Sequence, residues 1–281
     1  MIPLSSSIVA AVLLFSAGFA GAEEPDSIEA ALLGGADSTE FGIIDSQTRA
    51  ERQAGPKPGE NKAILVGEKL TFSVRYGVIR AGEATLEITG IENAGGYPCL
   101  HAVSKAKSNS FFDTVYKVRD TVESWMDQDG LFSRRFRKKL NEGNYHAFQE
   151  IEMDHRSRLA RYQDGRVFEF LPGAHDVLSA FYYVRTLDLV PGQEYWLESH
   201  ADRKNYPLKV RVHGRERVDT PAGKFDCIEV EPMLRTPGLF KNEGSLTIWL
   251  TDDERKMPVL MKSKIPIGSI TVTMTDFARP E

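Results

Sequence analysis

Apolar and polar residues alternate along most of the chain from Glu68 onward. In the first such run, Leu70, Phe72, Val74 and Tyr76 share one side and polar residues lie between them, which is the pattern of a half-buried β-strand. Later runs repeat this pattern and are separated by short turns rich in Gly, Pro, Asn and Asp. The chain is therefore predicted to be mainly β, with about eleven to thirteen antiparallel strands in a closed barrel, a half-open barrel or a sandwich.

One segment departs from the alternation. Residues His175 to Leu189, HDVLSAFYYVRTLDL, predict a helix that the Asp176 carboxylate can cap and that Pro191-Gly192 ends. Apolar residues occupy most of its circumference, which predicts a buried helix. The expected architecture is a twisted sheet around one central apolar helix at residues 175–189.

This helix allows two interpretations. As a lid over a cavity it presents Phe181, Tyr182 and Tyr183 to an apolar ligand, and Asp176 and Arg185 are further candidate ligand-binding residues. As a packing element it fills the interior of the sheet, so that no cavity remains.

The polar groups of the helix need partners if they are buried. Arg185 requires a carboxylate or solvent, and we expect Asp120, Glu123 or Asp202 to supply the carboxylate. The hydroxyl groups of Tyr182 and Tyr183 require hydrogen-bond partners in the same way.

Three regions are predicted along the chain. Residues 1–22 have the pattern of a signal peptide, because the apolar run Ile8 to Phe19 is too short to span a bilayer comfortably and Ala20-Gly21-Ala22 offers small residues for cleavage. This segment has no Lys or Arg, so an uncleaved anchor is the alternative. Residues 23–62, rich in Gly, Pro, Ala and charge, predict a disordered linker, and residues 63–281 predict a single antiparallel β-domain.

Charge and cysteine content narrow the function classes. A net charge of −5 with no basic excess gives a nucleic-acid partner no electrostatic support. The two cysteines, Cys99 and Cys227, could form a disulfide in an oxidising compartment, or both could be small buried apolar residues on strands.

Polar clusters offer weak candidates for catalysis. His200 and Asp202 share a strand face, as a proton relay or metal site would need, but no second His lies at useful spacing. His175 and Ser179 share a helix face, although the segment offers no oxyanion hole. No catalytic residue, cofactor or metal is therefore expected.

Two charged segments remain. Asp252-Asp253-Glu254 could bind calcium through its oxygens, but a solvated hairpin turn fits this sequence better. The basic run from Arg134 to Lys139 could bind anionic lipid headgroups or acidic glycans. The alternative is a solvated strand face or an edge strand that Lys and Arg protect from aggregation.

Four motifs occur in one order: YGVIRAGEATLEI, DVLSAFYYVRTLDLVPG, TPAGKFDCIEVEP and IWLTDDERKMPVLMKSKIPIGSI. Together they resemble the exported bacterial domain-of-unknown-function family 3108, over about residues 64 to 277. The resemblance implies an exported protein without an assigned activity and a twisted antiparallel β half-barrel. A looser likeness, at the level of the fold, is to the half-barrel carriers that shuttle lipoproteins across the periplasm.

The sequence thus favours an exported, periplasmic, non-enzymatic β-protein that binds a lipid or another hydrophobic ligand in the cell envelope. One alternative is a structural or interaction module with an envelope protein or a glycan as its partner. Another is a hydrolase or metal enzyme built around His200 and Asp202.

Overall fold

The computed structural model describes residues 61–234, 245–264, 268–278 and 280. The predicted signal peptide at 1–22 and the predicted linker as far as residue 60 lie outside the described residues.

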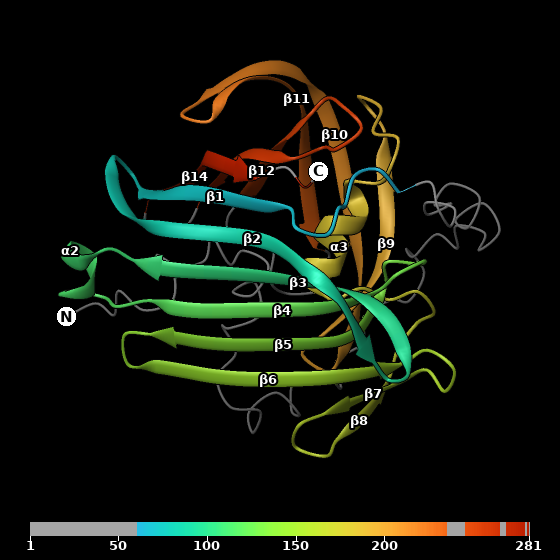
Figure 1. Ribbon diagram of the computed structural model, residues 1–281. Helices are drawn as coiled ribbons and strands as arrows, with labels where there is room; N and C mark the ends of the chain where they lie inside the picture. The colour runs from blue at the N-terminus through green and yellow to red at the C-terminus, as the bar shows by residue number, and fades with distance from the viewer. Residues whose placement is uncertain (1–60, 235–244, 265–267, 279, 281) are drawn as a thin grey trace, which may run out of the picture.

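All described strands belong to one antiparallel sheet of fourteen strands (Figure 1). Consecutive strands pair with each other from β1 to β8 and from β9 to β14, and the β1–β14 ladder joins the two halves. The predicted mainly β, antiparallel fold is confirmed, and the count exceeds the expected thirteen by one because β8 is too short to show an alternation. The elements are β1 Lys69–Tyr76, β2 Ile79–Ala94, β3 Tyr97–Ser108, α2 Ser110–Asp113, β4 Arg119–Asp127, β5 Ser133–Glu142, β6 Tyr145–Asp154, β7 Leu159–Tyr162, β8 Val167–Glu169, α3 Val177–Val184, β9 Glu194–Ala201, β10 Lys204–Thr220, β11 Gly223–Leu234, β12 Ser245–Thr251, β13 Pro258–Lys264 and β14 Ser269–Ala278.

The sheet curls into a half-barrel that no backbone ladder closes. Strands β2 to β6 cross the front of Figure 1, β9 to β12 run steeply behind them, and α3 lies in the bend. The two edge strands, β8 and β9, are consecutive in the chain. The segment that connects them, residues 170–193, carries α3. One connection therefore joins both edges of the sheet and places the helix within its curve.

Side chains join the two edges where the ladder is absent, and we call this set of contacts the seam. The Tyr162 hydroxyl lies 3.0 Å from His200 Nε2 and accepts a 2.6 Å hydrogen bond from the backbone N–H of Arg203. Gln149 Nε2 donates to Asp202 Oδ1 at 3.0 Å. Asp202 and Arg203 form the β9–β10 turn, and both have positive φ, 43° and 67°, as a tight two-residue hairpin turn requires.

The core lies on the concave face of the sheet and around α3. Its most deeply buried large side chains include Leu70, Phe72 and Ile228. Cys99 on β3 and Cys227 on β11 are buried and free, so they behave as small apolar strand residues and not as a disulfide. Burial raises the pKa of the Cys99 thiol to about 11 and that of the Cys227 thiol to about 12, which keeps both thiols protonated and unreactive.

The helix is shorter than the predicted 175–189. His175 cannot begin it, because its backbone pairs with β9: its N–H donates to Glu198 O at 2.8 Å, and its carbonyl accepts from His200 N at 2.9 Å. Beyond Val184 the backbone forms a tighter turn than an α-helix, because the N–H of Thr186 donates to the carbonyl of Tyr183, three residues earlier. The Thr186 hydroxyl donates to the same carbonyl at 2.7 Å. The regular helix therefore spans Val177–Val184.

Candidate functional site

Asp176 fastens the first turn of α3 to the sheet. Its Oδ1 accepts from the backbone N–H of Leu178 at 2.7 Å and of Ser179 at 2.8 Å, which confirms the predicted N-cap. Its Oδ2 accepts from the Ser124 hydroxyl on β4 at 2.5 Å. Burial raises the pKa of Asp176, although these hydrogen bonds favour the charged form. Both oxygens are thus occupied in holding the helix against β4.

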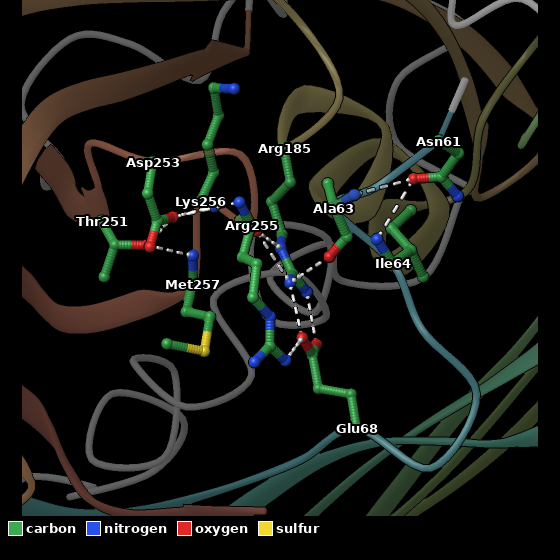
Figure 2. A network of polar contacts seen from close by, with 10 residues as sticks. All are labelled: Asn61, Ala63, Ile64, Glu68, Arg185, Thr251, Asp253, Arg255, Lys256 and Met257. Atoms are coloured by element: carbon green, nitrogen blue, oxygen red, sulfur yellow. Dashed lines mark hydrogen bonds and ion pairs between the residues drawn. The ribbon is translucent and has the colours of Figure 1, made fainter. Parts of the chain in front are cut away.

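Arg185 fastens the other end (Figure 2). The side chains of Arg185 and Glu68 are both fully buried. Arg185 Nη1 lies 2.7 Å from Glu68 Oε1, and Nη2 lies 2.8 Å from Oε2, so the pair is bidentate. Arg185 Nη2 also donates to the Ala63 carbonyl at 2.8 Å. The expected partners Asp120, Glu123 and Asp202 are wrong, because Glu68, just before β1, supplies the carboxylate.

The β12–β13 turn completes this network (Figure 2). Arg185 Nη2 donates to the Arg255 carbonyl at 3.1 Å, and Arg255 Nη2 donates to Glu68 Oε2 at 3.1 Å. Asp253 Oδ1 holds the turn by accepting from the Thr251 hydroxyl at 2.7 Å and from Arg255 N at 3.0 Å. Burial opposes the charge of Arg185, but attraction to Glu68 outweighs it and raises the pKa of Arg185. Arg185 thus links α3 to both halves of the sheet.

The acidic run at residues 252–254 is engaged within the protein. Asp253 caps its own turn, Asp252 Oδ2 accepts from Arg215 Nε at 2.7 Å, and Glu254 pairs with Lys62 at 3.1 Å. The three carboxylates face three different partners, which fits the hairpin-turn interpretation and not a calcium loop.

The three aromatic candidates on α3 have different surroundings. Phe181 lines an apolar pocket. Tyr182 has no exposed surface, lies 5.2 Å beneath the Arg185 guanidinium, and has a buried hydroxyl without a hydrogen-bond partner. The ring of Tyr183 lies 4.7 Å from that of His175. Of the five predicted ligand-binding residues, Phe181 lines this apolar pocket, while Asp176 and Arg185 anchor the helix.

The pocket lies between one face of α3 and three neighbouring strands. Its volume is about 20 Å³, about the room that one water molecule needs. The sequence identified Phe181 but missed the strand residues, although their positions on the apolar side of each alternation could have indicated them. All nine lining residues are nonpolar: Ala180, Phe181 and Val184 from α3, Leu208 and Val210 from β10, Val230 and Pro232 from β11, and Ile248 and Leu250 from β12.

His200 and Asp202 have different hydrogen-bond partners. The two ring nitrogens of His200 face the Tyr162 hydroxyl and, at 2.9 Å, Asn205 Oδ1, while Asp202 accepts from Gln149. Burial lowers the pKa of His200. Within the described ranges, no group of three or more His, Cys, Asp or Glu side chains could hold a metal ion. These residues serve the seam between the sheet edges.

Ser179 and His175 form no catalytic pair in this arrangement. The Ser179 hydroxyl donates to the Asp176 carbonyl at 3.2 Å. His175 is buried, and burial lowers its pKa to about 3. The hydroxyl therefore belongs to the helix cap.

The basic run is not an edge strand, because β5 lies between β4 and β6. Arg135 and Arg137 both pair with Glu150, and Arg137 also pairs with Glu123 at 3.4 Å. Lys138 points to the opposite, buried side. The outer face of β5 is therefore largely neutralised by its neighbours.

A buried carboxyl pair lies on the concave side of β4 and β5. Asp120 Oδ1 accepts from the backbone N–H of Asn141 at 2.7 Å, and Asp120 and Glu142 are both buried. Burial raises the pKa of Asp120 to about 7 and also raises that of Glu142. Burial lowers the pKa of the nearby Lys138, which is 8% exposed. The two carboxyls thus retain protons at a pH where exposed carboxyls are ionised.

Comparison with known proteins defines the class of this fold. The family model "Protein of unknown function (DUF3108)" matches residues 71–275, so the chain belongs to that family. A crystal structure of a β-barrel-like protein of domain of unknown function DUF1849 from Brucella abortus is similar, with a TM-score of 0.53 and 9% identity over 78% of this chain and 100% of that chain. This similarity shows a shared β-barrel-like fold.

Two further solved structures are similar at lower TM-scores. One is an exported protein with a YmcC-like fold from Bacteroides fragilis, with a TM-score of 0.34, 13% identity, and coverage of 80% of this chain and 99% of that chain. The other is described as a lipoprotein from Parabacteroides distasonis, with a TM-score of 0.35, 11% identity, and coverage of 76% and 96%. No curated protein sequence matches the chain. In the part of the chain that the structure describes, no helix is long and apolar enough to cross a membrane.

Breaking the Arg185–Glu68 pair will destabilise the protein strongly. Arg185→Met or Glu68→Met leaves an uncompensated buried charge, and we expect each to lower the free energy of unfolding by about 3–5 kcal/mol. The Arg185→Met/Glu68→Met double variant will lose less than the sum of the two single losses. Urea unfolding measures all three. As a control, Lys62→Met removes the exposed Lys62–Glu254 pair and will lower the free energy of unfolding by under about 1 kcal/mol. Equal losses of stability at the exposed and the buried pair would contradict the role of Arg185 and Glu68 as the anchor of the helix.

Removing the Tyr182 hydroxyl will not destabilise the protein, because that group is buried without a hydrogen-bond partner. We expect Tyr182→Phe to leave the free energy of unfolding unchanged or to raise it by up to about 1 kcal/mol. The matched control is Tyr195→Phe, since the Tyr195 hydroxyl donates to Asp188 O and accepts from Val190 N at 3.1 Å. Thermal unfolding measures the stability of both variants. Equal losses of stability in Tyr182→Phe and Tyr195→Phe would mean that the Tyr182 hydroxyl has a hydrogen-bond partner.

The buried carboxyl pair makes stability depend on pH. Folded Asp120 keeps its proton up to about pH 7, whereas in the unfolded chain it loses it near about pH 4. Between these values Asp120 holds a proton in the folded state and not in the unfolded chain, so the stability that this group contributes is greatest at low pH and is lost as the pH rises to about 7. We expect Asp120→Asn to flatten urea unfolding free energies between pH 5 and 8. Asp113→Asn is the control, because hydrogen bonds from Arg119 lower the pKa of Asp113 to about 2; an unchanged slope in Asp120→Asn would refute the assignment.

Proposed function

We propose that this protein is exported to the cell envelope and binds the apolar chain of a lipid between α3 and strands β10 to β12. The observation that carries the proposal is the pocket whose nine lining residues are all nonpolar, with Phe181 and Val184 on the helix facing Leu208 and Ile248 on the strands. Such a surface offers no polar group to recognise a hydrophilic ligand, so the ligand class is apolar.

The pocket must enlarge to hold such a ligand. Its volume is about 20 Å³, whereas ligand pockets typically measure about 300–1,000 Å³. One wall has to move away from the other. Which wall moves follows from how each is held.

The helix is the fixed wall. Asp176 ties one end to β4, and Arg185 ties the other to Glu68 and to the Arg255 carbonyl. Moving α3 would expose a buried ion pair to a new environment, at a cost of several kcal/mol. The helix therefore stays in place as the surface against which the ligand chain packs, and it does not act as a lid.

The strand wall ends at an edge strand of the sheet. Among the described strands β9 pairs only with β10; two backbone hydrogen bonds join it to His175, and contacts of Tyr162, Gln149 and their partners hold it to the opposite edge. Side-chain hydrogen bonds of this kind contribute about 0.5–1.5 kcal/mol each, which is little compared with a full ladder. A swing of the β9–β10 hairpin opens the pocket while the rest of the sheet stays paired.

Export to the periplasm is part of this proposal. The apolar run Ile8 to Phe19, followed by Ala20-Gly21-Ala22, supports it. Binding is the activity that the apolar pocket supports best, and the proposal includes a lipid as the partner and no cofactor.

Filling the pocket from the helix will weaken binding. Ala180 lines the pocket, so Ala180→Val and Ala180→Leu place about two and three more carbon atoms in it. We expect a fluorescent fatty-acid probe to bind the wild type, to bind Ala180→Val several-fold more weakly, and to bind Ala180→Leu weakest. Fluorescence titration in detergent-free buffer measures the affinity, and circular dichroism verifies that each variant is folded.

Val177→Leu is the control, because Val177 lies on the same helix but does not line the pocket. It should bind the probe as the wild type does. The proposal fails if the wild type binds no probe, or if folded Ala180→Val binds it with unchanged affinity. The milder Ala180→Val keeps the test decisive in case the larger Leu side chain prevents folding.

A further inference from the structure

Three turns gather at one end of the sheet, on the left of Figure 1. The β1–β2 turn adjoins α2, since Asn109 N donates to Ala81 O at 2.9 Å and Asn109 Nδ2 donates to Arg80 O at 2.7 Å. The far side of α2 adjoins the β5–β6 turn, since Gly143 N donates to Lys117 O at 2.8 Å. We call residues 75–83, 107–119 and 143–146 the rim.

The rim carries large apolar side chains at its most exposed points. Turns normally carry polar residues, and clustered apolar side chains on a surface mark an interaction site. These side chains come from all three segments of the rim. The exposed fractions are 83% for Val78, 50% for Ile79, 65% for Phe111, 75% for Val115 and 46% for Tyr145.

The exposure of Phe111 follows from how α2 is seated. Phe112 points inward and lines a small cavity with Val74, Ala106 and Val118. The Asn109 side chain caps the helix by accepting from Phe112 N at 2.9 Å. With Phe112 half-buried against this cavity, the adjacent Phe111 is directed outward. Phe112 and the Asn109 cap thus fix the orientation of α2, and the helix holds the Phe111 side chain in solvent.

The charge of the rim opposes that of the whole protein. The rim segments 75–83 and 107–119 hold five basic residues against two acidic ones, a local excess of three positive charges, while the chain as a whole carries −5. Arg119 pairs with Asp113, and both Arg80 and Lys107 pair with Glu83. The side chain of Lys117 is exposed. Apolar side chains flanked by cations fit the interface of an anionic bilayer, where acyl chains lie beneath negative headgroups.

We propose that the rim docks on the surface of a membrane that contains anionic lipids, with Val78, Phe111 and Val115 entering the interface. This inference goes beyond the proposed function and does not depend on it, because the rim residues do not line the pocket at α3. The insertion depth is small, since only turn tips carry the apolar side chains.

Vesicle flotation of the full chain tests the rim. We expect the wild type to float with vesicles of phosphatidylglycerol and phosphatidylcholine, and to bind less with phosphatidylcholine alone or in high salt. The triple variant Val78→Ser/Phe111→Ser/Val115→Ser should reduce the bound fraction about tenfold. Lys117→Glu should reduce binding to the anionic vesicles only. All variants share the same N-terminal residues, so the differences report on the rim.

The matched control is Ile91→Ser/Val167→Ser/Leu171→Ser, which removes apolar side chains that are 53%, 42% and 45% exposed outside the rim. It should float like the wild type. Equal loss in the control and rim variants overturns the proposal, as does a rim variant that floats unchanged, which would leave a protein as the partner of the rim. Ala180→Leu should float as the wild type does, and the rim variant should still bind the fatty-acid probe. A failure of the rim proposal can therefore be told from a failure of the proposed lipid binding in the pocket.

Discussion

The buried pair of Arg185 and Glu68 is the interaction on which the rest of the structure depends. Two fully buried charges are tolerated only where attraction and hydrogen bonds replace lost hydration, and here Ala63, Glu68 and Arg255 fill the guanidinium positions. These partners come from the start of β1 and from the β12–β13 turn, on either side of the β1–β14 ladder. One side chain on α3 therefore fixes how the two halves of the sheet meet around the helix.

That constraint explains why an open sheet can have a defined curvature. Thirteen ladders link fourteen strands in a row, but a fourteenth ladder, between β8 and β9, is absent. The connection between these edges carries α3 through the concave side, and the anchors at Asp176 and Arg185 hold it there. The sheet thus curls around an element that is bound to both of its halves. The seam at Tyr162 and His200 completes the closure without a ladder between strands.

The strands were largely predictable from the sequence because each depends on local alternation and local turns. β1, Lys69–Tyr76, coincides with the alternating run from Leu70 to Tyr76, and the Asp176 cap was evident from its position before an apolar run. The wrong predictions concern the partner of Arg185 and the bounds of the helix, which depend on contacts between residues far apart in the sequence. Glu68 lies 117 positions from Arg185, and the pairing of His175 with β9 shortens the helix. Neither leaves a periodic signal, and the same holds for the seam and for the strand wall of the pocket.

The distribution of anchors divides the molecule into a fixed part and a yielding part. Each ladder hydrogen bond is one of many that must break together, whereas the seam consists of a few side-chain contacts around Asp202 and Arg203, whose turn holds two non-glycine residues at positive φ. Such conformations cost about 1 kcal/mol or more each, and the two-residue turn between β9 and β10 requires them. Tyr162 and Gln149 hold this turn against the opposite edge, and loss of their contacts would break no ladder between strands. The same hairpin supplies Leu208 and Val210 to the pocket, so the opening that we propose would move one wall of the apolar site.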